Sequence, residues 1–202
     1  MIRNFIELGY EDMPGFSEGD IFENNDPHYG GIHAPDFDTA MPIFHEGRLI
    51  AWASCVTHVS DSGSVTPGSV GFLNPDCYSD GVPISMEKVG ENDAYYPWYD
   101  MRIRSRTRTP DFVLGDAKGR LAGCITMRER LMDVIDKYGI DFYLDATHEF
   151  VEDSRRYAVS RVRTQAVPGR IRKSNFKDLA MKGKRVLLPQ QNVDCLFNLP
   201  LE

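Results

Sequence analysis

The chain has 202 residues, of which 42% are hydrophobic and 26% are charged, and its formal net charge is −7 at pH 7. These values are typical of a globular protein long enough to bury a real core, in one generous domain or two small ones. No window approaches the roughly 18 consecutive apolar residues of a membrane span, and the N-terminal segment lacks the apolar stretch of a secretory signal, so we expect no membrane partner.

The acidic and basic side chains are distributed unevenly along the chain. Residues 1–100 hold 17 acidic and 3 basic side chains, whereas residues 101–202 hold 13 acidic and 20 basic ones. No RNA-stacking motif accompanies the arginines, so we expect no nucleic-acid partner and interpret the basic half as complementary to acidic surface on the first half or on another subunit. Four scattered cysteines without a CxxC pair favour a reducing cytoplasm over a disulfide scaffold.

The first predicted element is a β-hairpin within residues 40–59. MPIFH is followed by a Glu46-Gly47 turn and then by RLIAWASCVTH, with the β-branched and aromatic content that favours strands. Because the second strand is almost continuously apolar, we expect it to be buried on both faces. Residues 61–100 are predicted to be a long functional loop whose aromatic residues lie at a subunit interface; these are Tyr95, Tyr96, Trp98 and Tyr99.

Two helices are predicted next. Thr109 and Pro110 are typical of a helix start, apolar residues then recur at helical spacing, and Gly139 ends that helix. Asp141 can cap a second, antiparallel helix that ends before Pro168, and the tail is predicted to be extended. The expected fold class is α+β, with a β-rich region over 1–108, a helical hairpin over 109–168 and an irregular, extended tail over 169–202, as one domain or as part of a larger one.

Two copies of the pattern His-x-x-Asp flank the predicted hairpin. They are His33-Ala-Pro-Asp36 and His58-Val-Ser-Asp61. If the strands pair in simple register, these side chains meet at one margin of the sheet. Two imidazoles and a carboxylate suit a divalent transition ion, although histidines that merely cap strands or bond to carboxylates remain an alternative. The Gly-rich turns match neither the P-loop nor the Rossmann fingerprint and predict no nucleotide site.

The segment GDIFENNDPHYGGIHAPDFD, with THVSDSG after the hairpin, resembles the hydantoinase B/5-oxoprolinase family. The shared pattern is NDP-x-x-GG-x-H-x-x-D followed by H-x-x-D-x-G. Within that family, THVSDSGSVTPGS and KVGENDAYYPWYD most resemble the α subunits of acetone carboxylases. The resemblance runs from about residue 14 to residue 165, and it is densest over 19–69.

The resemblance implies an Mn²⁺ ion held by His33, Asp36 and His58, with Asp61 in an outer position; Zn²⁺ and Fe²⁺ would accept the same ligands. It also implies an acetone carboxylase-like ligase with companion β and γ subunits. There, ATP bound to a partner subunit activates bicarbonate and a small ketone, which are joined to give acetoacetate. Subunits of this family are far longer than 202 residues. We therefore expect metal binding rather than independent turnover, from an internal fragment or from a reduced protein.

Two other functions remain open. The first is an ATP-dependent hydrolase subunit for cyclic amides, of the hydantoinase or 5-oxoprolinase type. The second is a non-catalytic assembly domain whose oppositely charged halves dock onto companion subunits.

Overall fold

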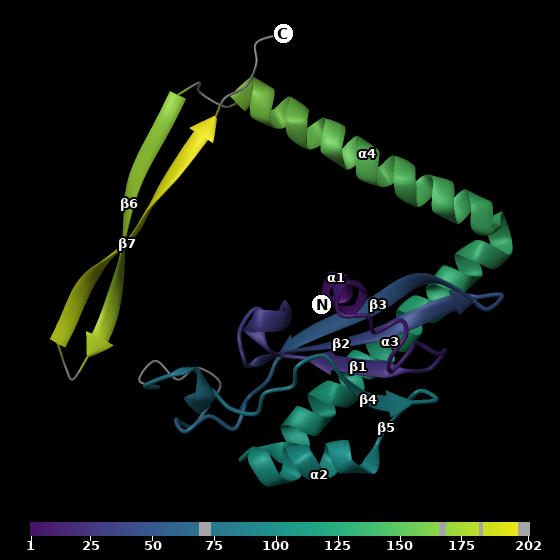
Figure 1. Ribbon diagram of the computed structural model, residues 1–202, viewed down its shortest axis with the longest axis horizontal. Helices are drawn as coiled ribbons and strands as arrows, with labels where there is room; N and C mark the ends of the chain where they lie inside the picture. The colour runs from purple at the N-terminus through teal and green to yellow at the C-terminus, as the bar shows by residue number, and fades with distance from the viewer. Residues whose placement is uncertain (69–73, 166–168, 182–183, 198–202) are drawn as a thin grey trace. The chain divides into compact units, whose positions relative to one another are not determined.

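The computed structural model describes residues 1–68, 74–165, 169–181 and 184–197 (Figure 1). The α+β class is confirmed, with an antiparallel sheet in the N-terminal part and helices after it. The chain divides into two compact units, Met1–Asp133 and Val134–Glu202, and the division falls inside a long helix, α3 (Pro110–Tyr138). None of the helices in the described residues combines the length and the apolar character of a transmembrane segment.

The first unit is built on one five-stranded antiparallel sheet in the order β3-β2-β1-β4-β5 (Figure 1). Its strands are β1 (Ile21–Asn24), β2 (Asp36–His45), β3 (Arg48–His58), β4 (Glu87–Glu91) and β5 (Ala94–Tyr95). The other elements of this unit besides α3 are α1 (Ile2–Glu7), α2 (Pro97–Arg106) and two short 3₁₀ turns, η1 (Pro27–Tyr29) and η2 (Cys77–Ser79). The prediction of a loop over 61–100 is therefore wrong for the second half of that range, which contains β4, β5 and the start of α2.

The predicted hairpin is confirmed as β2 and β3. Glu46 and Gly47 have φ angles of 50° and 78°, and positive φ at both central residues is what a type I′ turn requires. The prediction that the second strand is buried on both faces is wrong. β3 lies at the edge of the sheet, where of its residues only Ala53 is buried, whereas β2 lies between two neighbours and carries the buried residues.

The sheet has a separate hydrophobic cluster on each face, because successive side chains of a strand point to opposite sides. Phe37, Met41 and Ile43 pack with residues of α2 and α3 in the larger cluster. On the opposite face Phe22 packs with Phe5 of α1 and with partly buried aromatic neighbours in the smaller one. β1 and β2 are thus covered on both faces, which fixes the position of the ends of β2.

The helix predicted after Thr109 is confirmed as α3. Most of its predicted apolar residues pack in the larger cluster, and Gly139, with a φ angle of 88°, follows its last turn. α4 (Ile140–Gln165) has no buried residue, and its antiparallel packing against the first helix remains a prediction. The tail, predicted to be extended and irregular, contains an antiparallel pair of strands, β6 (Gly169–Met181) and β7 (Lys184–Phe197), whose register shifts between Lys173 and Asn175. Residues 198–202 of that prediction lie outside the described part.

The four aromatic residues predicted to form an interface divide into two groups. Tyr99 is buried and stacks on Tyr95 with ring centroids 4.6 Å apart, and the Tyr95 hydroxyl donates a hydrogen bond to the Ala117 carbonyl at 3.0 Å. For these two tyrosines the interface prediction is wrong, because they belong to the core between the sheet and α3. Tyr96 and Trp98 form a second stacked pair, and Trp98 is partly exposed.

The Asp93 carboxylate in the β4–β5 turn should make stability depend on acidic pH. Two hydrogen bonds of 2.8 and 2.7 Å from Arg128 of α3 hold the pKa of Asp93 below its ordinary value. A lowered folded-state pKa contributes stability above the unfolded-state pKa, and that contribution is lost as pH falls through the folded-state value. Because Asp93 is partly exposed, we expect Asp93→Asn to cost at most about 1 kcal/mol at pH 7. In urea melts the difference from wild type should shrink as pH falls below the ordinary aspartate pKa; a difference that stays the same on acidification would contradict the assignment.

Candidate metal centre

Asp36 and His58 face each other at the open end of the β2–β3 hairpin. Asp36 is the first residue of β2, His58 is the last residue of β3, and the two are directly paired across the strands. Directly opposite side chains of an antiparallel pair share one face of the sheet. Asp36 Oδ1 accordingly lies 2.8 Å from Nδ1 of His58.

His33 reaches the same carboxylate from the preceding bend. The Asp36 N–H donates to the His33 carbonyl at 2.9 Å, and this turn brings His33 Nε2 to 3.0 Å from Asp36 Oδ2. The two imidazole rings are 5.0 Å apart between centroids. The structure therefore brings together all three residues that the sequence suggested as metal ligands, with the carboxylate between the imidazoles.

The donor set fits a divalent ion. One ligand atom from each residue lies within 4.8 Å of the others. Bonds of about 2.0–2.2 Å in a tetrahedral arrangement place ligand atoms about 3.3–3.6 Å apart, so closure needs the farthest pair to approach by about 1.2–1.5 Å. The side chains of His33 and His58 are 43% and 46% exposed, which leaves both rings room to rotate. Three protein ligands also leave coordination positions for water or substrate.

Asn25 holds the loop that carries His33. Its buried side-chain amide donates to the carbonyls of Ala34 and Val82 at 2.7 and 2.8 Å, and its Oδ1 accepts the Ile84 N–H at 2.7 Å. At Gly31 a Cβ atom would meet the backbone of Asn25 and the following residue at 2.9 Å. The NDP-x-x-GG part of the motif therefore fixes the backbone of the loop that carries His33. The sequence analysis missed this role because it considered only the spacing of possible metal ligands.

Asp61, predicted to lie in an outer position, is buried and bonded mainly to Arg108. Its carboxylate accepts the Arg108 backbone N–H at 2.6 Å, the Arg108 guanidinium at 3.1 Å and the Gly63 N–H at 3.2 Å. The same guanidinium donates to the Ser64 carbonyl at 2.9 Å. These bonds fasten the segment after β3 to the residues just before α3. Arg108 was missed from the sequence because nothing in its spacing distinguishes it from other exposed arginines.

If the contact between Asp61 and Arg108 positions His58 by holding the segment after β3, substitution of either residue should weaken metal binding to a similar extent. Asp61→Asn and Arg108→Met are each expected to weaken metal binding by about 10–100-fold, the usual effect of losing an outer partner. Competition with a fluorescent chelator measures the change. An Arg130→Met variant, which alters an exposed arginine of α3, is the control. A loss in Asp61→Asn alone would instead point to a direct contact between Asp61 and the centre.

Among the residues that the structure describes, the other histidines do not join this group. His28 pairs with Asp26, with Nδ1 and Oδ1 3.0 Å apart, His45 lies at the turn end of β2, and His148 is exposed on α4. The three cysteines with described side chains, Cys55, Cys77 and Cys124, are free thiols.

The start of β2 and the end of β3 thus carry two His-x-x-Asp motifs at one margin of the sheet. Residues 1–189 match the family model described as hydantoinase B/oxoprolinase, and the chain belongs to this family. It is 34% identical over 203 residues to the acetone carboxylase alpha subunit of Xanthobacter autotrophicus, which covers 100% of this chain and 26% of that protein. A solved structure described as nucleotide-free acetone carboxylase is 36% identical with a TM-score of 0.83, and the match covers 88% of this chain and 23% of that one.

The likeness extends to a caprolactamase subunit. The chain is 28% identical over 128 residues to the caprolactamase subunit beta of Pseudomonas jessenii, covering 62% of this chain and 22% of that protein. The chain thus spans about a quarter of the length of each of these two relatives.

Proposed function

We propose that this chain is the metal-binding part of an ATP-dependent ketone carboxylase α subunit, and that His33, Asp36 and His58 hold one Mn²⁺ ion. The observation that carries the proposal is the position of the Asp36 carboxylate, 3.0 and 2.8 Å from nitrogens of two separate imidazoles. Zn²⁺ and Fe²⁺ are the alternative ions, because they accept the same ligand types. The likeness to the acetone carboxylase alpha subunit supports the reaction class.

In the proposed reaction, acetone and bicarbonate are activated by phosphoryl transfer from ATP. The enolate carbon of acetone then forms a bond to the carboxyl carbon, the transferred phosphoryl groups leave as inorganic phosphate, and acetoacetate results. The bound ion would supply a Lewis acid that polarises a carboxyl or enolate oxygen. The contribution of this chain is to orient the two imidazoles and the carboxylate at a strand end, through the register of β2 and β3 and through the loop that Asn25 holds. ATP would be used on a partner subunit, and β- and γ-type subunits would complete the assembly.

A cyclic-amide hydrolase subunit is the second candidate. The caprolactamase relative favours it, and the same three ligands could hold an ion that activates water or a lactam. The uneven charge distribution would serve either enzyme, or a non-catalytic assembly domain, as a docking surface for partner subunits.

Metal content and substrate consumption test the proposal. We expect the purified chain to bind close to one equivalent of Mn²⁺ or Zn²⁺ by elemental analysis, the His33→Ala variant to bind none, and the matched His45→Ala variant to bind as wild type. With partner subunits supplied, bicarbonate-dependent consumption of acetone is expected, and lactam hydrolysis would identify the second candidate. Equal metal content in wild type and His33→Ala would remove the basis of both enzyme functions and leave the assembly domain.

A further inference from the structure

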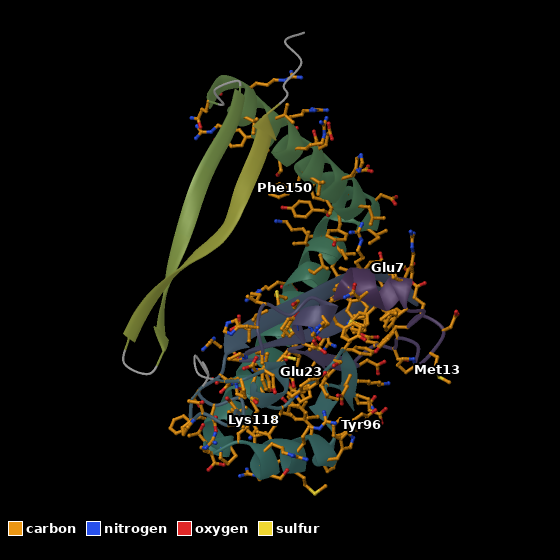
Figure 2. The ribbon with its side chains drawn as sticks, turned by 60° about the vertical axis from the view of Figure 1, so that its left-hand side comes forward. Glu7, Met13, Glu23, Tyr96, Lys118 and Phe150 are labelled. Atoms are coloured by element: carbon orange, nitrogen blue, oxygen red, sulfur yellow. The ribbon has the colours of Figure 1, made fainter. Side chains whose placement is uncertain are left out.

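Two thiols from distant parts of the sequence meet between the sheet and α3. Cys124 of α3 belongs to the larger hydrophobic cluster, and Cys55 of β3 packs against that cluster. Side chains of the sheet and of α3 fill the space between the two elements (Figure 2). Thr39 of β2 connects the two positions, because it is paired with Cys55 across the strands and its carbonyl accepts the Cys124 thiol at 3.5 Å. The two cysteines therefore lie at one register position on the face of the sheet that α3 covers.

Gly123 allows the Cys55 side chain to approach α3 closely. A Cβ atom at position 123 would lie 2.7 Å from Cys55 Sγ, so a side chain there would collide with the thiol. Cys124 is the next residue of α3, and its thiol forms a hydrogen bond with the Cys55 side chain. A disulfide has an S–S bond of about 2.05 Å, so rotation of the two side chains must bring the sulfur atoms closer than this contact.

The two thiols differ in their access to solvent. Cys55 is partly exposed, whereas Cys124 is fully buried. Burial, and to a smaller extent the neighbouring Cys55 thiol, raises the pKa of Cys124 to about 12. A buried thiol that stays protonated is inert towards a dissolved oxidant. An oxidant from solution should therefore react with Cys55 first, and Cys124 is placed to react with the product.

We propose that Cys55 and Cys124 are a redox-sensitive pair, which hydrogen peroxide converts into an intramolecular disulfide between β3 and α3. In the first step the Cys55 sulfur attacks one peroxide oxygen, the O–O bond breaks, and the sulfenic acid of Cys55 and one water are formed. The Cys124 sulfur then attacks the Cys55 sulfur, the S–O bond breaks, and the hydroxyl group leaves as water with the Cys124 proton. The two sulfurs lose two electrons, and the peroxide gains them.

The disulfide would hold the edge strand of the sheet against α3. β3 has a neighbouring strand on one side only, and His58, a proposed metal ligand, is its last residue. The bond would also close the long loop between residues 55 and 124. Closing a long loop stabilises the folded state mainly by restricting the unfolded chain. We therefore expect the oxidised protein to unfold at a higher urea concentration than the reduced protein.

Disulfide mapping tests the inference in the full chain carrying Cys77→Ser and Cys195→Ser, in which Cys55 and Cys124 are the remaining thiols. After the folded, reduced protein is treated with hydrogen peroxide, we expect both thiols to disappear and a peptide pair joining Cys55 to Cys124 to be found under non-reducing conditions. Adding Cys124→Ala should abolish this pair. Absence of the pair under conditions that oxidise Cys77 in wild type would overturn the inference. A crosslinked protein that unfolds at a lower urea concentration than the reduced one would also overturn it.

Glycine substitutions in α3 test the close approach of Cys55 separately. Gly123→Ala is expected to displace the Cys55 thiol and to slow crosslinking roughly tenfold, because disulfide geometry tolerates little displacement. Gly119→Ala is the matched control, since a Cβ atom at position 119 of the same helix meets nothing within 4 Å. It should crosslink as fast as the parent chain. Equal rates in the two variants would show that Cys55 does not pack on Gly123 and would overturn the geometry on which the inference rests.

Discussion

The Arg120→Met variant is expected to lower the free energy of unfolding by about 3–5 kcal/mol. Arg120 of α3 and Glu23 of β1 have fully buried side chains, and Arg120 Nη2 donates to Glu23 Oε1 at 2.5 Å. The same guanidinium donates to the hydroxyls of Thr39 and Thr57 at 2.8 and 2.7 Å. Methionine fills a similar volume but leaves the Glu23 carboxylate buried without a counter-charge, which is far costlier than losing an exposed ion pair.

Urea denaturation of single and double variants tests this expectation. Glu23→Leu combined with Arg120→Met removes both charges, so the double variant should recover most of the loss. Arg130→Met, which removes an exposed ion pair of the same helix, should stay within about 0.5 kcal/mol of wild type. Two results would contradict this expectation. One is a decrease in the free energy of unfolding below about 1 kcal/mol in Arg120→Met, and the other is a double variant that is less stable than both single variants.

The Asp36→Asn variant is expected to bind the metal ion more than about 100-fold more weakly than wild type. Loss of a residue that only contacts a metal ligand typically weakens binding by about 10–100-fold. The carboxylate supplies the one negative charge among the three candidate ligands, and asparagine keeps its shape without that charge. The matched control is Asp38→Asn, because Asp38 lies two residues further along β2 on the same face and accepts a hydrogen bond from Ser54 at 2.6 Å. Competition with a chelator for Mn²⁺ and Zn²⁺ measures both variants. Equal affinities for the two variants would contradict a ligand role for Asp36.

The hairpin, α3 and the gathering of His33, Asp36 and His58 could be predicted because each depends on a local pattern. Each pattern is visible within a short stretch of sequence: the Glu46-Gly47 turn, the helical spacing of apolar residues after Pro110, and the repeated His-x-x-Asp motif. The position of β3 at the sheet edge could not be predicted, because a continuous apolar run is equally compatible with burial on both faces. Only the neighbours that β2 acquires from β1 decide which strand is central.

The remaining strands depend on contacts between distant residues. β1 has four residues and includes Glu23, a residue type that is almost never buried without a partner. Its counter-ion, Arg120, lies 97 positions later in the sequence. β4 contains the polar residues of EKVGE and is held by pairing with β1 and β5. Likewise, the Asp61–Arg108 contact joins positions that no short motif connects.

The pairing of Asp36 with His58 closes the hairpin ladder at the end remote from the turn. If either strand slipped by one position, one of these two side chains would move to the other side of the sheet. A misaligned hairpin could then no longer bring the three candidate ligands together, even if the rest of the molecule were folded. Ion uptake followed during refolding would therefore report when the strands have reached their native alignment.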